Sequence, residues 1–152
     1  MEKTLDLITG HFPVRKEEMR AYSALSLAYI GDSVYDLIIK TMLVTRGHDR
    51  PNHYHRKAVD YVSAAAQTMI MNRIRPLLNE EEKTIFRRGR NSKTISPAKN
   101  QSHHDYRIAT GFEALVGYLY LTGQRERMLE LITEGISVVE SDEEPGSREQ
   151  GE

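Results

Sequence analysis

Apolar side chains recur every three or four residues along most of the chain, which is the spacing of amphipathic α-helices. Alternating patterns and short apolar runs that are typical of strands are scarce. The pattern therefore predicts an all-α fold, a bundle of helices. The expected helical segments span residues 21–45, 51–74, 80–88, 105–121 and 124–139.

Residue types at the ends of these segments support their bounds. Pro51 opens the second segment, and Pro76 lies just beyond its end. Asn79 is suited to cap the third segment, which has an acidic first turn and a basic last turn, and Gly89 is expected to form its C-cap. Residues 89–102 are expected to form a loop. The residues expected to face inward are Val59, Val62, Ala66, Met69 and Ile70 in the second segment and Met128, Leu129, Ile132, Ile136 and Val139 in the last.

The length of 152 residues suits one domain. We expect a folded domain at residues 21–140, a partly ordered extension at 1–20 and an acidic, disordered tail at 141–152. The absence of cysteine excludes disulfides, thiolate metal ligands and a cysteine nucleophile, and it fits a reducing compartment. No apolar run reaches the roughly 18 residues of a membrane helix, and the first residues carry charges where a signal peptide is apolar. A cytoplasmic protein without a membrane partner is the expectation.

The net charge of −1 hides an asymmetry along the chain. The tail, from Glu140 onward, holds six acids against one arginine. A basic middle and an acidic end favour a polyanionic partner. Between residues 83 and 107 the basic residues are Lys83, Arg87, Arg88, Arg90, Lys93, Lys99 and Arg107, and the one acid is Asp105.

Two of the most apolar segments carry isolated acids. Asp32 and Asp36 are the only acids in residues 25–44, and Glu113 is the only charged residue in 108–121. A buried carboxylate requires a cation or stays protonated. No lysine or arginine lies three or four residues from Asp32 or Glu113, whereas Asp36 lies four residues from Asp32, where like charges repel. A bound divalent metal would reverse the sign of that interaction.

Glycines accompany these acids, because Gly31 precedes Asp32 and Gly117 lies one turn after Glu113. A glycine inside a helix costs about 1 kcal/mol relative to alanine, and its usual benefit is close approach of two helices. Such an approach would bring the two acids together. Oxygen ligands without cysteine favour Mg²⁺, with Mn²⁺ as a substitute. The alternative is that the acids simply reach solvent at a helix edge.

The segment LAYIGDSVYD at residues 27–36 resembles the signature helix of the ribonuclease III catalytic domain. The segment FEALVGYLY at residues 112–120 resembles that family's second carboxylate helix, and the order and separation of the two also match. The closest likeness is to Mini-III ribonucleases, which lack an appended double-stranded-RNA-binding domain. Residues 51–57, 87–91 and 106–107 resemble that subclass as well, so that the likeness covers about residues 25–136.

The chain departs from full-length ribonuclease III at three positions. That family's signature helix carries two more glutamates, where this chain has Leu25 and Ala28, and its second helix carries an aspartate, where this chain has Thr110. The Mini-III pattern shares these losses, so they indicate the subclass. The number of metal ions and any contribution from Asp36 or Thr110 are left open.

The resemblance implies a ribonuclease III-type endonuclease that works as a homodimer and cuts both strands of double-stranded RNA. Asp32 and Glu113 would be the catalytic residues and would hold Mg²⁺, with Asp36 as a further candidate ligand. Products would carry 5′-phosphate and 3′-hydroxyl ends, and tyrosines and apolar residues of the signature helix would form part of the dimer contact. For Mini-III the implied substrate is a stem in precursor 23S ribosomal RNA, and a ribosomal protein is a candidate further partner.

The expected loop at residues 89–102 suits A-form RNA, which is recognised mainly by shape through phosphates and 2′-hydroxyls. It is cationic and lacks aromatic residues on which bases would stack. The candidate RNA contacts are Arg88, Arg90, Asn91, Lys93, Lys99, Arg107 and His55.

Two other functions compete with this interpretation. The pairs His48-Asp49 and His104-Asp105 could belong to a helical metal-dependent phosphohydrolase of the HD class, although no further ligand spacing supports them. A catalytically degenerate ribonuclease III-like domain that binds RNA or ribosomes without cutting is the non-enzymatic alternative.

Overall fold

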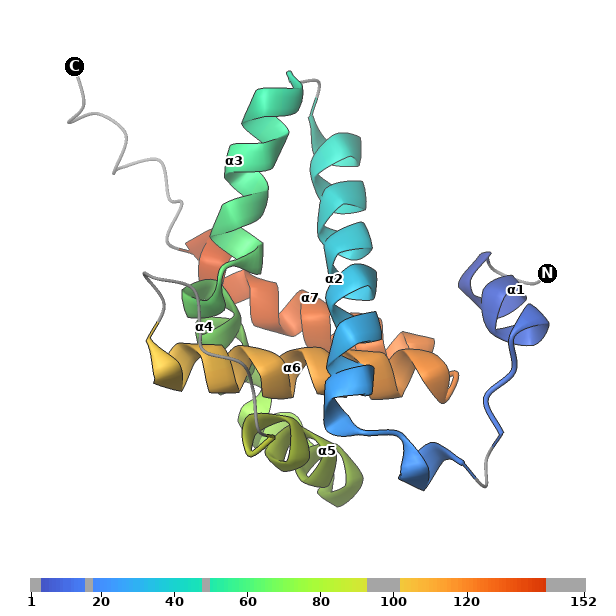
Figure 1. The fold of residues 1–152 in the computed structure, drawn as a ribbon. Helices are drawn as coiled ribbons and strands as arrows, with labels where there is room; N and C mark the ends of the chain where they lie inside the picture. The colour runs from blue at the N-terminus through green and yellow to red at the C-terminus, as the bar shows by residue number, and fades with distance from the viewer. Residues whose placement is uncertain (1–3, 16–17, 48–49, 93–101, 142–152) are drawn as a thin grey trace, which may run out of the picture.

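The structure, a computed structural model, describes residues 4–15, 18–47, 50–92 and 102–141, and all regular elements within these ranges are helical (Figure 1). The all-α prediction is confirmed. The helices are α1 (Thr4–His11), α2 (Ala24–Arg46), α3 (Pro51–Val62), α4 (Ala64–Ile74), α5 (Glu80–Arg90), α6 (His103–Leu121) and α7 (Arg125–Ser141), with 3-10 turns at Met19–Ala21 and Arg75–Leu77. No helix of these residues is long and apolar enough to cross a membrane.

Helix α6 runs through the middle of the molecule, and α2, α4, α5 and α7 all pack against it (Figure 1). This central place explains why α6 is apolar on nearly every side. Tyr35 of α2 and Phe112 of α6 meet edge to face in the core, with ring centroids 5.1 Å apart. The buried Tyr35 hydroxyl donates to the carbonyl oxygen of Tyr61 at 2.7 Å, which also fastens the end of α3 to α2.

The segment expected as one helical region at 51–74 is two helices, separated at Ser63. Ser63 has extended backbone angles, and its hydroxyl accepts a hydrogen bond from the backbone N–H of Ala66 at 3.2 Å. A serine at this position caps a new helix and so ends the previous one. The break rotates the faces of the two helices, and the expectation that Val59 and Met69 face inward is wrong because both are exposed.

The start of α5 was predicted correctly, and its end was not. Asn79 forms a capping box with Glu82, in which each side chain accepts a 2.9 Å hydrogen bond from the other's backbone N–H. Gly89 is not the C-cap, because α5 continues to Arg90. A β-carbon on Gly89 would lie 2.8 Å from the β-carbon of Ala114, so this glycine allows α5 to pack closely on α6. Residues 89 and 90 therefore belong to a helix instead of the expected loop, and residues 93–101 of that loop lie outside the described residues.

Helix α7 buries Met128, Ile132, Ile136 and Val139 as expected, whereas Leu129 is exposed. It extends to Ser141, the first residue of the expected tail, and the rest of the tail lies outside the described residues. Before the domain, α1 is held by Arg125, which donates to the Leu5 carbonyl oxygen at 3.1 Å and to the Thr9 hydroxyl at 2.6 Å.

Candidate active site

The backbones of α2 and α6 touch where they cross, at Gly31 and Gly117. A β-carbon on Gly31 would lie 1.8 Å from the carbonyl oxygen of Glu113, and one on Gly117 would lie 2.0 Å from the carbonyl oxygen of Leu27. Real β-carbons do not approach other atoms this closely, so only glycine fits at either position. The predicted close approach is confirmed, and it sets Asp32, which follows Gly31, beside Glu113.

The surroundings disfavour the charges of both acids. Burial and, to a lesser extent, the Asp32 carboxylate raise the pKa of Glu113 to about 8, although the Gln67 amide opposes the rise. Burial also raises the pKa of Asp32, and Asp36 adds to the effect. Asp32 nevertheless reaches solvent, whereas Glu113 is partly buried, so the pair is open on one side. Two neighbouring carboxylates with raised pKa values are typical of a site that binds a cation.

Gln67 adds a third helix, α4, to the site. Its side chain is 2% exposed, and Nε2 donates to the carbonyl oxygen of Val62 at 3.1 Å. Its Oε1 is buried and has no hydrogen-bond partner among the described residues. Gln67 was not among the site residues predicted from sequence; the available signal was an amide within the apolar helical pattern of residues 64–71.

The two other candidate ligands have partners elsewhere. Asp36 pairs with Lys40, one turn further along α2, at 2.8 Å. The Thr110 hydroxyl is buried and donates to the Tyr106 carbonyl oxygen at 2.9 Å. Among the described residues, no group of three or more histidine or acidic side chains is placed to hold a metal ion.

This donor set fits a magnesium ion better than zinc. Mg²⁺ keeps several waters and often binds through only one or two carboxylates, whereas zinc sites use four protein ligands when structural and three when catalytic. Asp32 and Glu113 could supply two oxygen ligands, and beside Glu113 lies Gln67, whose Oε1 has no hydrogen-bond partner among the described residues. The residues present therefore fit a hydrated divalent cation.

A pocket with basic walls lies at the N-terminal end of α6. Arg90 and Asn91 from the end of α5 and Arg107 from α6 line this pocket of about 260 Å³, together with Arg75 and His104. We call these five residues the basic pocket. Arg75 and His104 were missed because they are far from each other along the chain, and only the fold brings them together.

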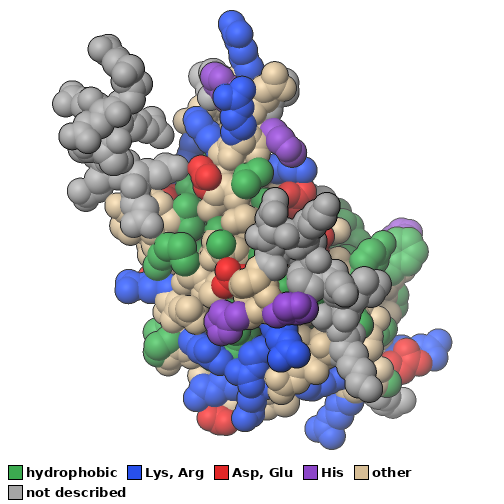
Figure 2. Space-filling view, turned by 60° about the vertical axis from the view of Figure 1, so that its left-hand side comes forward, with side chains coloured by type: hydrophobic (Ala, Val, Ile, Leu, Met, Phe, Trp, Pro, Cys, Tyr) green, Lys and Arg blue, Asp and Glu red, His purple; other side chains and the backbone are tan. Residues whose placement is uncertain are grey.

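The basic pocket and the acids share one helix. Arg107 precedes Glu113 by six residues, which is about 9 Å along α6 at about 1.5 Å per residue. Figure 2 shows a face on which lysine and arginine side chains gather below histidines, with a small acidic patch just above the histidines. A polyanion could therefore contact both groups at once.

The remaining candidate RNA contacts lie elsewhere. Arg88 donates to the Tyr22 carbonyl oxygen at 2.9 Å and lines a different groove, with Met19 and Tyr118. His55 lies on α3 beside Lys40. Lys93 and Lys99 fall outside the described residues.

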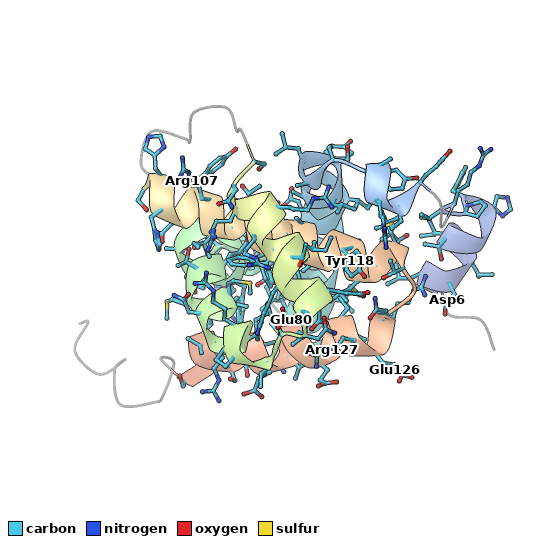
Figure 3. The ribbon with its side chains drawn as sticks, turned by 90° about the horizontal axis from the view of Figure 1, so that it is seen from below. Asp6, Glu80, Arg107, Tyr118, Glu126 and Arg127 are labelled. Carbon is cyan, nitrogen blue, oxygen red and sulfur yellow. The ribbon has the colours of Figure 1, made fainter. Side chains whose placement is uncertain are left out.

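A larger pocket, of about 610 Å³, is lined by none of the predicted site residues. Asp6, Glu126 and Arg127 line it just beyond the C-terminal end of α6, and Figure 3 shows them well away from Arg107. Both of its arginines are engaged in the fold: Arg125 pairs with Asp6, and Arg127 pairs with the buried Glu82 at 2.9 Å.

The histidine–aspartate pairs do not form a second metal centre among the described residues. His104 lines the basic pocket among arginines, which would repel a cation. His48 and Asp49 lie outside the described residues.

Comparison with known proteins agrees with this geometry. The family model of the Ribonuclease III domain matches residues 25–124. The chain is 48% identical to a Mini-ribonuclease 3 of Enterococcus faecalis, over 75% of this chain and 90% of that protein. It is 43% identical to the Mini-ribonuclease 3 of Clostridium tetani, over 82% and 83% of the two chains.

A solved structure shares the fold. The crystal structure of a protein from Fusobacterium nucleatum superimposes with a TM-score of 0.70 at 30% identity, and covers 82% of this chain and 98% of that one. With two glycines at the α2–α6 crossing, two acids beside them and these relatives, the chain belongs to the ribonuclease III family, in its Mini-ribonuclease 3 branch.

Proposed function

We propose that this member of the ribonuclease III family is a Mg²⁺-dependent endonuclease that cuts double-stranded RNA, with Asp32 and Glu113 forming its active site. The observation that carries the proposal is the α2–α6 crossing, which sets these carboxylates side by side where neither charge is favoured. A divalent cation held there would acidify an attacking water and offset charge on the leaving 3′ oxygen. The products would carry 5′-phosphate and 3′-hydroxyl ends.

The protein's own residues set up this reaction. The crossing fixes the backbone position from which the Glu113 side chain extends. Because the pKa of Glu113 is raised, its carboxyl would release a proton on binding a cation. Asp32 is open to solvent, so an approaching phosphodiester can reach it. Mn²⁺ is expected to substitute for Mg²⁺ because both prefer oxygen ligands.

The basic pocket is proposed to bind RNA phosphates. Arg90, Asn91 and Arg107 provide hydrogen-bond donors around one cavity, and no carboxylate among the described residues pairs with either arginine. Donors of this kind position an A-form duplex through its backbone. Residues Arg88, His55, Lys93 and Lys99 stay candidates for contacts beyond this pocket.

We propose that the chain forms a homodimer through the outer face of α2. Leu25, Tyr29, Leu37 and Val44 are large apolar residues that are exposed on this one helix, and Tyr29 is 81% exposed. Residues three, four and seven positions apart share a helix face, so Asp32 lies on the same stripe as Leu25 and Tyr29. A partner docked there would border the active site, as expected of an enzyme that cuts both strands.

The likeness to Mini-III ribonucleases extends the proposal to a biological role. The substrate would be a stem of precursor 23S ribosomal RNA in the cytoplasm, with a ribosomal protein as a candidate partner. A duplex with the sequence of that stem, compared with an unrelated duplex of equal length, is the substrate pair that tests this role.

A gel assay of a duplex labelled on both strands tests the activity. With Mg²⁺ the wild type should cut, and Asp32→Asn should lower the rate by about 100-fold or more because the charge that holds the cation is lost. Asp60→Asn, which removes an exposed acid of α3, is the matched control and should cut normally. Undiminished cleavage by Asp32→Asn would refute the site, whereas binding without any cutting would favour the degenerate alternative.

A further inference from the structure

Gln67 is the buried polar side chain of the site that the proposed reaction does not yet use. It belongs to α4, which packs against α6, and it is 2% exposed. A buried amide has two N–H donors and an acceptor oxygen, and each is costly to leave unpaired. Its hydrogen bonds therefore indicate what it does.

The amide of Gln67 has a backbone partner and lies beside Glu113. Nε2 donates to the Val62 carbonyl oxygen at 3.1 Å, and the amide opposes the rise in the pKa of the Glu113 carboxyl. The Val62 carbonyl oxygen can only accept, so the nitrogen and not the oxygen of the amide faces it, and an ionised Glu113 carboxylate would likewise accept from the amide. The orientation of the amide is thereby fixed.

The break between α3 and α4 makes this arrangement possible. Val62 is the last residue of α3, and its carbonyl oxygen is one of those that a helix end leaves without an intrahelical partner. Ser63 starts α4 one residue later, and Gln67 lies on the first turn that follows. The end of α3 thus supplies a rigid backbone anchor for an amide that reaches Glu113.

We propose that Gln67 is a positioning residue that holds the Glu113 carboxylate beside Asp32 and completes the hydrogen bonding of the site when a hydrated divalent cation binds. Carboxylates that bind metals are usually oriented by such partners. The buried Oε1, which has no partner among the described residues, accepts from the water that a hydrated cation brings. The inference rests on the proposed function, because it needs a cation at Asp32 and Glu113.

Thr68 is the matched control on the same helix. It is buried like Gln67, and its hydroxyl donates to the Ala64 carbonyl oxygen at 2.9 Å and approaches that of Asp105 at 3.4 Å. Its approach to α6 is therefore to a backbone carbonyl oxygen, and it forms no hydrogen bond to Asp32 or Glu113 among the described residues. If Gln67 only packed α4 on α6, substitutions at Gln67 and at Thr68 would have the same effect on metal binding.

Calorimetric titration of the full chain with Mn²⁺, without RNA, separates the two roles. Gln67→Met keeps the length of the side chain but removes both hydrogen bonds, and it should weaken Mn²⁺ binding about 10- to 100-fold. Thr68→Val should bind Mn²⁺ as the wild type does. Thermal unfolding in EDTA should show both variants folded. In cleavage assays the Mn²⁺ concentration for half-maximal rate should rise for Gln67→Met, and saturating Mn²⁺ should restore much of its rate.

The outcomes distinguish a failure of the proposed role of Gln67 from a failure of the proposed metal site. If the wild type binds no Mn²⁺, or Asp32→Asn binds as well as the wild type, the proposed metal site itself fails. If those two behave as expected and Gln67→Met still binds with wild-type affinity, only the role of Gln67 is wrong. Should Gln67→Met not fold, Gln67→Asn retains an amide that is one methylene too short, and wild-type affinity in that variant overturns the inference.

Discussion

Gly31 lies directly against the backbone of Glu113: a β-carbon on the glycine would come within 1.8 Å of the glutamate carbonyl oxygen. The neighbour of one acid therefore touches the main chain of the other. Because α2 and α6 cannot separate at this point without moving Asp32 away from Glu113, the close contact of the two helices and the geometry of the candidate site are the same feature. Changes at the crossing should affect stability and metal binding together.

Gly117→Ala tests the crossing. Its added methyl would meet the Leu27 carbonyl oxygen at 2.0 Å, and backbone cannot rotate away as a side chain can. We expect the free energy of unfolding to fall by about 3 kcal/mol, the upper end of the usual cost of overpacking, in urea denaturation. Gly47→Ala is the control and should be nearly neutral, because nothing lies within 4 Å of the added carbon. Equal stability of the two variants would contradict the geometry.

The helical class, the N-cap at Asn79 and the glycine-mediated crossing could all be predicted from sequence. Each has a local signal: periodicity, a capping residue at a fixed offset, or a glycine where a helix would prefer alanine. Gly89 shows the limit of such signals. A glycine near a helix end is typical of a cap, but here it packs against Ala114, and only tertiary structure distinguishes the two uses.

Other features depended on contacts between distant segments. Ser63 is compatible with a helix interior or a cap, and the apolar spacing on either side did not reveal that the helix breaks there. Arg75 and His104 join the basic pocket, and Gln67 joins the acids, only after the chain folds. Pairwise contacts of this kind leave no periodic trace in a single sequence.

Leu37→Lys tests the proposed dimer. Leu37 is 54% exposed on the outer face of α2, and a buried ammonium at a dimer contact would be strongly unfavourable. We expect light scattering to show a dimer for the wild type and a monomer for the variant. Leu129→Lys is the control, because Leu129 is similarly exposed, at 44%, but on α7. A wild type that is monomeric at tens of micromolar, or a dimer unaffected by Leu37→Lys, would exclude this face as the contact.

Arg107→Gln tests the basic pocket as a phosphate site. Binding of a duplex by the Asp32→Asn protein should weaken, and the slope of log affinity against log salt should become shallower by about 0.7–0.9, the value for one phosphate contact. Arg73→Gln removes the same charge from an arginine that pairs with Glu134 at 2.9 Å. This control should leave the slope nearly unchanged. Equal changes in both variants would mean that only net charge matters.

The pKa of Glu113 makes a prediction about stability in the absence of metal. Burial and Asp32 raise this pKa from an ordinary 4.5 to about 8 in the folded protein. A raised carboxyl pKa means that the folded state binds the proton more tightly than the unfolded chain does. The stabilisation is therefore fully present below about pH 4.5 and is lost as the pH rises toward 8.

Glu113→Gln isolates this effect, because glutamine stays neutral while the histidines and other groups titrate equally in both proteins. In EDTA, the unfolding free energy of the wild type should fall relative to that of Glu113→Gln between pH 5 and pH 8. Urea denaturation at several pH values measures both free energies. Saturating Mn²⁺ should reverse the trend for the wild type alone, because the cation stabilises the ionised carboxylate. A difference between the two proteins that stays constant across this range would show that Glu113 titrates normally and does not share a desolvated site with Asp32.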